Sequence, residues 1–464
     1  MQRIARLLDA SQSEYSPRQA LVRLWVLAAQ PGQLNSWEQQ ENEASVATTL
    51  LAFRARLDQE AAFDAHEIES HPLTLIRALD DHLAAQRSSG SPKRLGASCV
   101  RFSEDDHDHW LVPVVLQARR TVSLARQASN HARWFHHHAV LPARTAHGQQ
   151  VTLEASRSML DTALHTLASQ HSAALNVWVA HFDDGADVQW TQKLSPVNNW
   201  RATKVQPHDA RAASVATSLE HARHAGAHVV VLPEFTVDLA HRSHIAQLLR
   251  NQPPGSPVQL VVAGSFHEPV APGGPGDALP PHAAHNTAPV FNGQGRVLWS
   301  HRKLRLFGDS RHGTEHAEVG NHLHVLLTPL GCMTVLICKD FLDEHESVSD
   351  LLKEVPVDWV WVPSFGDDKT LRAHQAGARH LARTTPGTTS VVAQTQNTVL
   401  AAPGTSLPPL PGFGHAAGQP EPTPCVDVTG GVLSFPLGLQ PEPPGLPHSP
   451  PPAATKRPSL KLIK

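Results

Sequence analysis

The chain divides into three regions by its pattern of apolar and polar positions. Residues 1–173 show mainly helical spacing, residues 174–400 show short apolar runs that alternate with helices, and residues 401–464 contain 16 of the 38 prolines. Apolar positions three and four residues apart are typical of helices, whereas short continuous apolar runs are typical of strands buried in a sheet. The pattern therefore predicts a mainly helical N-terminal domain, a layered α/β domain and a proline-rich, extended tail.

In the N-terminal region, Ser16 and Pro17 have the residue types of a helix N-cap and first helical position, and they precede the apolar run 19–30. The other helices expected here share the same spacing: residues 43–57, a helix that Ser70 caps and that runs through Leu83, and residues 152–169.

The middle region is expected to form a mixed sheet covered by helices. Its apolar runs predict strands at residues 175–180, 229–232, 258–263, 287–291, 297–300, 323–327, 333–337, 359–362 and 389–393. Amphipathic spacing predicts helices at residues 209–225, 239–251 and 371–383. Residues 293–295 (Gly-Gln-Gly) favour a hairpin turn between two of the strands, and residues 431–435 form one weak strand in the tail.

Composition excludes several classes of protein. Lys and Arg number 39 against 42 Asp and Glu, a net charge of -3, so a dedicated nucleic-acid binder is not expected. No apolar run reaches membrane-spanning length, and four cysteines are too few for a disulfide scaffold. A reducing, cytoplasmic location is the expectation. The triplet His136–His138 offers metal-ligating side chains, but its pattern favours a polar loop over a metal site.

Three groups capable of chemistry follow apolar runs. Glu234 ends the run in VVVLPEF, Lys303 follows a strand in SHRKLRLF, and Cys338 ends the run in MTVLICKD. Functional side chains converge at strand ends in open sheets, so these three are expected to share one site. A single such residue is usually a solvated loop residue or core filler; the combination favours nucleophilic catalysis.

In these motifs the chain resembles the nitrilase superfamily of carbon–nitrogen hydrolases. That family's Glu–Lys–Cys triad corresponds to Glu234 in LPEF, Lys303 in HRKLRLF and Cys338 in LICKDF, which are separated by 69 and 35 residues. The resemblance covers residues 174–400 and implies an αββα sandwich. Supporting similarities lie in the segments HAGAH (224–228), AGSF (263–266), HNTA (285–288) and ARHLAR (378–383).

The resemblance also implies a role for each site residue. Cys338 is the nucleophile, Glu234 exchanges protons with it, and Lys303 stabilises the tetrahedral intermediate together with the backbone N–H of Lys339. The family places a second glutamate beside the lysine, and Glu315 is favoured over Glu318 for this position.

The chain departs from the family at Lys339, where an aromatic residue is common. A lysine that faces the substrate would favour an anionic substrate, whereas one that points away is merely solvated. Asp340, two residues after the nucleophile, is expected to be a structural hydrogen-bond acceptor. The residues 1–173 have no counterpart in a plain amidase.

The function implied is that of a cysteine-dependent hydrolase that cuts a non-peptide C–N bond of a small amide, ureido or nitrile compound. No cofactor and no metal ion are expected, and family members typically pair as homodimers. Two alternatives stay open. One is a soluble acyltransferase with the same triad; the other is a sensor or scaffold whose N-terminal domain binds partners.

Overall fold

The computed structural model describes most of the chain. The residues described are 1–41, 43–88, 100–104, 107–114, 134–155, 163–164, 166–167, 174–182, 188–193, 199–269, 283–309, 313–342, 348–384, 388–396, 412–417, 419–425 and 430–437.

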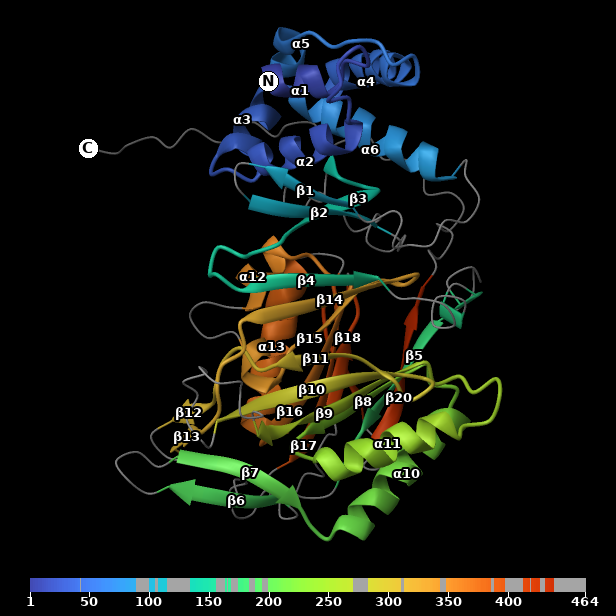
Figure 1. Cartoon of the computed structure of the whole chain (residues 1–464), viewed down its shortest axis with the longest axis vertical. Helices are drawn as coiled ribbons and strands as arrows, with labels where there is room; N and C mark the ends of the chain where they lie inside the picture. The colour runs from blue at the N-terminus through green and yellow to red at the C-terminus, as the bar shows by residue number, and fades with distance from the viewer. Residues whose placement is uncertain are drawn as a thin grey trace, which may run out of the picture.

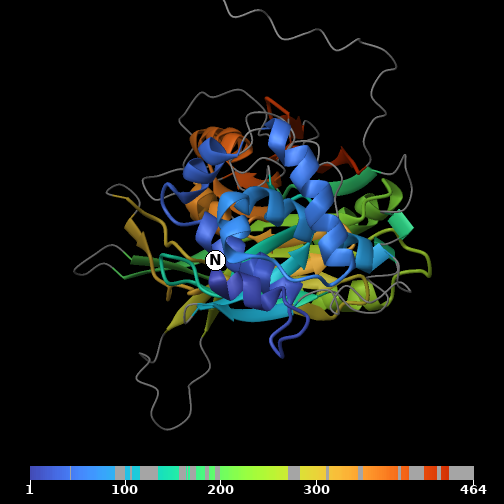
Figure 2. The same ribbon diagram turned by 90° about the horizontal axis from the view of Figure 1, so that it is seen from above.

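The N-terminal region begins with helices and ends with a small sheet. The helices are α1 (Gln2–Leu7), α2 (Pro17–Ala28), α3 (Gln33–Gln40), α4 (Glu43–Asp58), α5 (Ala65–Ser70) and α6 (Pro72–Ser88). The antiparallel sheet is formed by β1 (Val100–Glu104), β2 (His107–Pro113) and β3 (His138–Pro142). Figures 1 and 2 show that these helices lie at one end of the molecule, over the larger sheets.

Two larger sheets follow. The first has the strand order β11-β10-β9-β8-β5-β20. Its members are β5 (Ala174–Ala180), β8 (Val229–Glu234), β9 (Leu260–Pro269), β10 (Ala284–Asn292), β11 (Val297–Arg302) and β20 (Gly430–Pro436). The second has the order β19-β18-β17-β16-β15-β14-β4. Its members are β4 (Gln150–Ala155), β14 (His322–Thr328), β15 (Gly331–Val335), β16 (Trp359–Gly366), β17 (Thr389–Gln396), β18 (Gly412–His415) and β19 (Thr423–Cys425).

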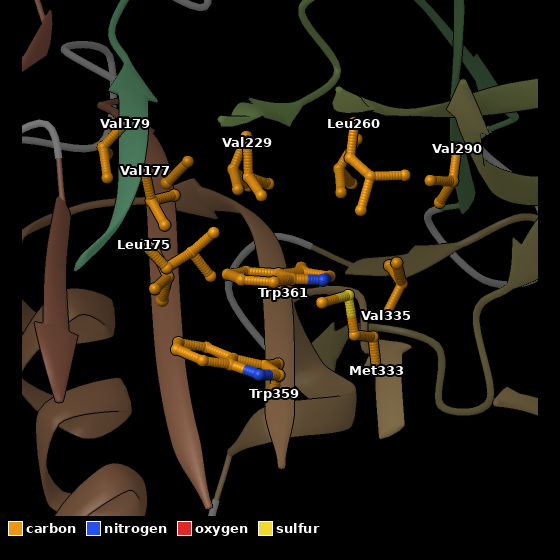
Figure 3. Packing of buried hydrophobic residues seen from close by; sticks show 14 of the residues in the cluster. Leu175, Val177, Val179, Val229, Leu260, Val290, Met333, Val335, Trp359 and Trp361 are labelled. Carbon is orange, nitrogen blue, oxygen red and sulfur yellow. The ribbon is translucent and has the colours of Figure 1, made fainter. Parts of the chain in front are cut away.

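The two sheets pack face to face, with helices on their outer faces. Between the sheets, Val177 and Val229 of the first lie in one core cluster with Trp359 and Trp361 of the second, as Figure 3 shows. The outer face of the first sheet packs on α10 (His208–His224) and α11 (Leu239–Arg250), and that of the second on α12 (Val348–Glu354) and α13 (Asp368–Thr384). The αββα sandwich expected from the sequence is therefore confirmed.

The small N-terminal sheet joins the helices to the sandwich. Leu111 and Val140 pack into the core of the N-terminal helices, whereas their chain neighbours Val112 and Leu141 pack into the outer core of the second sheet. Successive residues of a strand face opposite sides, so this sheet is buried on both faces.

A fourth, smaller sheet lies at the opposite end of the molecule from the N-terminal helices (Figure 1). It has the order β12-β13-β7-β6, formed by β6 (Val188–Lys193), β7 (Asn199–Val205), β12 (Gly308–Asp309) and β13 (Gly313–Glu315). The sequence pattern does not predict these strands.

Two expectations for the chain outside residues 174–400 need correction. The helix expected at residues 152–169 is wrong over its first residues, because β4 pairs in parallel with β14 there, Leu153 lying opposite Val325. Part of the proline-rich tail is packed into the sheets, whereas the sequence predicts that most of it is extended and unpacked. Strands β18 and β19, which the sequence does not predict, join the second sheet. The weak strand expected at residues 431–435 is confirmed as β20, which pairs antiparallel with β5 along its length. Pro424 lies in an edge strand and Pro436 ends its strand, the positions a sheet tolerates for proline.

One helix cap was expected correctly and one was not. Ser16 is the N-cap of α2, and its hydroxyl accepts the backbone N–H of Gln19. Ser70, in contrast, ends α5. The N–H groups of Leu73 at the start of α6 and of Thr74 are satisfied instead by the carboxylate of Glu41, at 2.6 and 3.0 Å, a tertiary contact that local sequence cannot reveal. Among the described helices, none is long and apolar enough to cross a membrane.

Candidate active site

The centre of the site is a buried ammonium group held between two carboxylates. Nζ of Lys303 donates to Oε1 of Glu234 at 2.9 Å and to Oε2 of Glu315 at 2.8 Å. All three residues are at most 2% exposed. A buried charge is tolerated only when it is paired and hydrogen-bonded. The structure thus brings together the glutamate and lysine expected from the sequence, and Glu315 rather than Glu318 supplies the second carboxylate.

Ends of strands position these groups. Glu234 is the last residue of β8, Glu315 is the last residue of β13, and Lys303 directly follows β11. Beside Glu234, Gly264 of β9 has a φ of +62°, and a Cβ there would lie 2.2 Å from the carbonyl oxygen of Pro233. A glycine is therefore required for β9 to approach β8 this closely next to the carboxylate.

Two further buried side chains hold the carboxylates in place. The Nδ2 group of Asn286 donates to Oε1 of Glu234 and to Oε1 of Glu315, both at 2.8 Å. His267 contacts Oε1 of Glu315 through Nε2 at 3.0 Å, and its Nδ1 accepts the backbone N–H of Ala202 at 2.8 Å. Asn286 lies in the segment HNTA that supports the resemblance, but the sequence assigns neither residue a role, since both lie within ordinary strands.

Cys338 follows β15 in a strained turn. Its φ is +43°, a left-handed value that is costly for any residue other than glycine and that is concentrated at functional sites. Its Sγ lies 3.7 Å from the carbonyl oxygen of Phe365 and accepts from the hydroxyl of Ser364 at 3.5 Å. The thiol is thus aimed at the end of β16, in a backbone conformation that the surrounding structure must maintain.

The charges around the thiol set its proton affinity. Burial, together with the charge of Glu234, raises the pKa of Cys338 to about 12, and the charge of Lys303 opposes this shift. Burial also raises the pKa of Glu234. For Lys303, burial is outweighed by Glu234 and Glu315, whose charges raise its pKa well above the usual value. The pKa of Glu315 is lowered, because the charge of Lys303 outweighs the effect of burial.

At rest the site therefore holds a protonated thiol beside a carboxyl group of raised pKa and a permanent ammonium ion. The raised pKa of Cys338 means that its thiolate forms only when a base takes the proton, and the raised pKa of Glu234 makes its carboxylate a stronger base than an ordinary one. The ammonium ion uses two of its three N–H donors on the carboxylates, and within the described chain no acceptor takes the third.

A polar chain runs behind the thiol. The hydroxyl of Ser364, which donates to Sγ, also lies 2.8 Å from Nε2 of His374. Burial, followed by the charge of Lys303, lowers the pKa of His374 to about 3, so its imidazole is neutral at physiological pH. When its Nε2 carries the proton, His374 donates to Ser364, which leaves the serine hydroxyl proton for Sγ or for Oε1 of Gln394 at 3.3 Å. The sequence motifs reveal neither of these residues.

Asp340 joins the two turns that carry the lysine and the cysteine. Its carboxylate accepts the backbone N–H groups of Leu304 at 3.0 Å, Arg305 at 2.7 Å and Ile337 at 3.1 Å. The expectation that Asp340 is a structural acceptor is confirmed. By holding the segment after Lys303 against the turn before Cys338, it fixes the Cys338 thiol relative to the ammonium group.

Lys339 is half-buried beside the site. Its Nζ lies 5.9 Å from the ring centroid of Phe307, whose backbone N–H donates to Oε2 of Glu315 at 2.9 Å. The Lys339 side chain therefore contacts an aromatic residue whose backbone is hydrogen-bonded to Glu315.

The histidine triplet has a structural explanation. The carboxylate of Asp80 accepts the backbone N–H groups of His136 at 2.6 Å and of His137 at 2.8 Å, and it contacts Nδ1 of His138 at 2.9 Å. Asp80, Asp81 and His137 are near enough to share an ion, but Asp81 is paired with Arg77 at 3.0 Å. These contacts fix the entry to β3.

No model of a known protein family matches the chain, and no curated protein resembles it in sequence. Solved structures of the nitrilase superfamily resemble it in fold. Nit3 of Saccharomyces cerevisiae, a member of branch 10 of that superfamily, is 15% identical with a TM-score of 0.40, over 58% of this chain and 92% of its own. An amidase from Nesterenkonia sp. is 16% identical with a TM-score of 0.39, over 58% and 92%.

The NitFhit protein of C. elegans is 15% identical with a TM-score of 0.41, over 58% of this chain and 62% of its own. All three comparisons describe a likeness in fold only. At such identities and TM-scores they assign no residue role and no activity to this chain.

The hydrogen bond from Ser364 to Sγ generates a prediction. Hydrogen bonds to charged groups contribute about 1.5–3 kcal/mol, so the Ser364→Ala substitution is expected to raise the pKa of the Cys338 thiol and slow its alkylation by iodoacetamide about tenfold or more. Mass spectrometry of the peptide that contains Cys338, across a pH series, measures the rate.

The matched control is Thr395→Val, which removes a buried hydroxyl that has no hydrogen-bond partner in the described structure. Equal alkylation rates for Ser364→Ala and Thr395→Val at every pH would show that Ser364 does not act on the thiol.

Proposed function

We propose that this chain is a cysteine-dependent hydrolase that cuts a non-peptide carbon–nitrogen bond, with amides as the main substrates. The observation that carries the proposal is the Lys303 ammonium group held between Glu234 and Glu315, with its charge and that of Glu234 both acting on the Cys338 thiol. A metal ion or cofactor is not needed for the steps that follow.

In the first half-reaction, Sγ of Cys338 attacks the amide carbon while Glu234 accepts the thiol proton. The carbonyl oxygen becomes an oxyanion, and the remaining N–H of Lys303, assisted by the backbone N–H of Lys339, stabilises its charge. Glu234 then gives its proton to the amide nitrogen. The C–N bond breaks, ammonia or an amine leaves, and a thioester remains on Cys338.

In the second half-reaction, Glu234 is again a carboxylate and accepts a proton from water as the water attacks the thioester carbon. The second tetrahedral intermediate breaks at its C–S bond, the thiolate is reprotonated from Glu234, and the carboxylic acid leaves. Glu315 keeps its negative charge throughout, because Lys303 holds its pKa low. It acts by positioning and balancing the ammonium ion.

The activity predicts ammonia release from primary amides that depends on the thiol. Purified protein is expected to release ammonia from members of a panel of aliphatic amides, aromatic amides, ureido acids and nitriles. Because no other group attacks the carbon, Cys338→Ala should lower the rate at least 10³-fold. A coupled ammonia assay measures it, and Cys332→Ala, which alters another buried cysteine, is the control.

The same panel tests Lys339. If its ammonium group contacts the substrate, Lys339→Gln should raise KM for carboxylate-bearing amides about tenfold and leave KM for neutral amides unchanged.

Ammonia release that is equal in wild type and Cys338→Ala would contradict the hydrolase. Thioester turnover with hydroxylamine but not with water would instead indicate acyl transfer to an amine.

The pH dependence follows from Glu234. Its carboxylate form accepts the thiol proton, and its pKa is raised above the ordinary 4.5, so kcat/KM should rise with pH through an acid limb above 4.5. The hydrogen bond from Asn286 lowers the pKa of Glu234. Asn286→Ala should therefore move the limb to still higher pH in kcat/KM profiles.

The control for this shift is Ser265→Ala, which removes a buried hydroxyl with no hydrogen-bond partner among the described residues, next to Glu234 in the sheet. A limb at the same pH in Asn286→Ala and Ser265→Ala would mean that Glu234 is not the titrating base.

A further inference from the structure

The hairpin β6–β7 is linked by hydrogen bonds to the polar centre of the site, which consists of Lys303, Glu234 and Glu315. In the small sheet, Trp200 of β7 lies opposite Glu315 of β13, and the N–H of His316 donates to the carbonyl oxygen of Trp200 at 2.8 Å. The N–H of Ala202 donates to Nδ1 of His267, whose other ring nitrogen contacts Glu315. The hairpin thus has a fixed position relative to the lysine and its carboxylates.

Two tryptophans of this hairpin contact aromatic residues that lie next to the site. Trp190 and Trp200 contact each other with ring centroids 5.2 Å apart, and both contact Phe235, the residue after Glu234, at 5.2 and 5.9 Å. Trp190 also lies 5.8 Å from Phe365, whose carbonyl oxygen faces Sγ of Cys338, and Trp200 lies 6.1 Å from Phe307. We call these five residues the aromatic collar.

Burial differs between the collar and the polar centre. Four of the rings (Trp190, Trp200, Phe307 and Phe365) are partly exposed, whereas Lys303 is 1% and Cys338 4% exposed. The rings therefore lie nearer the surface than the reacting groups do. Large aromatic surfaces that stay partly exposed gain free energy when an apolar group covers them.

We propose that the aromatic collar binds a planar apolar group on the acyl side of the substrate, so that aryl and arylalkyl amides are preferred over small aliphatic ones. This inference rests on the proposed hydrolase function. The acyl side is favoured because the acyl group is bonded to Sγ from the first half-reaction into the second, and the backbone carbonyl oxygen of Phe365, a residue of the collar, lies 3.7 Å from Sγ. Ring pairs in the collar already meet edge to face, the arrangement that an additional aryl ring could extend.

The plain alternative is that these rings form only a small core. Val188, Ala202, Val205, Phe235 and Phe266 do form such a core, and the tryptophans pack against it. However, among the described strands the hairpin pairs with β13 and with neither sheet of the sandwich, and its tryptophans are among the least buried members of the cluster. The hairpin is also hydrogen-bonded to His267 and lies opposite Glu315 in the small sheet, and both of these residues belong to the site.

Ammonia release from phenylacetamide and from propionamide, in wild type, Trp190→Ala and Trp190→Leu, tests this inference. Wild type is expected to favour phenylacetamide. Both variants should lower the ratio of kcat/KM values (phenylacetamide over propionamide) about tenfold, a factor equivalent to about 1.4 kcal/mol, through KM for the aryl substrate. Trp190→Leu keeps an apolar side chain, so it separates loss of the ring from loss of packing.

The matched control is Trp110→Ala, which removes a partly exposed tryptophan from another small antiparallel sheet, in the N-terminal region. A ratio that is unchanged in both Trp190 variants would overturn the inference while hydrolysis itself continues.

If wild type hydrolyses no amide, the proposed function fails, and calorimetric titration with phenylacetate then tests the collar alone. The collar would be supported as an aryl site if Cys338→Ala binds phenylacetate and the double variant Cys338→Ala/Trp190→Leu does not. No binding by Cys338→Ala would overturn it as well.

Discussion

The structure of the site depends on one interaction, the hydrogen-bonded ion pairing of Lys303 with Glu234 and Glu315. An ammonium ion that is 1% exposed requires anionic partners, and two carboxylates that share one cation require further donors. Asn286 and His267 are those further partners. Because the ammonium ion stabilises Glu315 strongly, the proton affinity of the cluster is concentrated on Glu234, the group that the proposed reaction needs as its base.

The fold meets this requirement by bringing strand ends together. Glu234, Lys303 and Cys338 follow three different strands of the two facing sheets, and Glu315 comes from the small sheet that carries the tryptophan hairpin. Asp340 ties the segment after Lys303 to the turn before Cys338 through three backbone N–H groups. The proposed catalytic geometry and the proposed selectivity are thereby linked, since the strand that supplies Glu315 also positions β7.

Much of this could be predicted from the sequence, for a physical reason. The strands at the centre of the sandwich are buried on both faces, so each appears as a continuous apolar run, and the glutamate and cysteine end two such runs. The partners Asn286, His267, Ser364 and His374 were not predictable in the same way. Their roles come from contacts between residues 10 to 65 positions apart, which no local pattern encodes.

The strands that the sequence misassigns have a common feature: they depend on a partner strand elsewhere in the chain. Residues 150–155 form β4 by pairing with the edge that β14 offers, and β18, which the sequence does not predict, pairs with β17. The weak strand expected at residues 431–435 is confirmed as β20, although its partner β5 lies far earlier in the chain. Hairpin β6–β7 has few apolar positions, and its tryptophans pack on Phe235, directly after β8, and on Phe365 of β16, which are distant in the sequence.

The central claim, that Cys338 carries a thioester in the reaction, is tested most directly by mass spectrometry. Wild-type protein is mixed with a primary amide that it hydrolyses and is quenched in acid during turnover. Digestion should then yield the peptide of Cys338 with a mass increase equal to the acyl group minus one hydrogen, an increase that neutral hydroxylamine removes. Turnover of the amide with no acyl group on Cys338, or with the acyl group on another residue, would contradict the account.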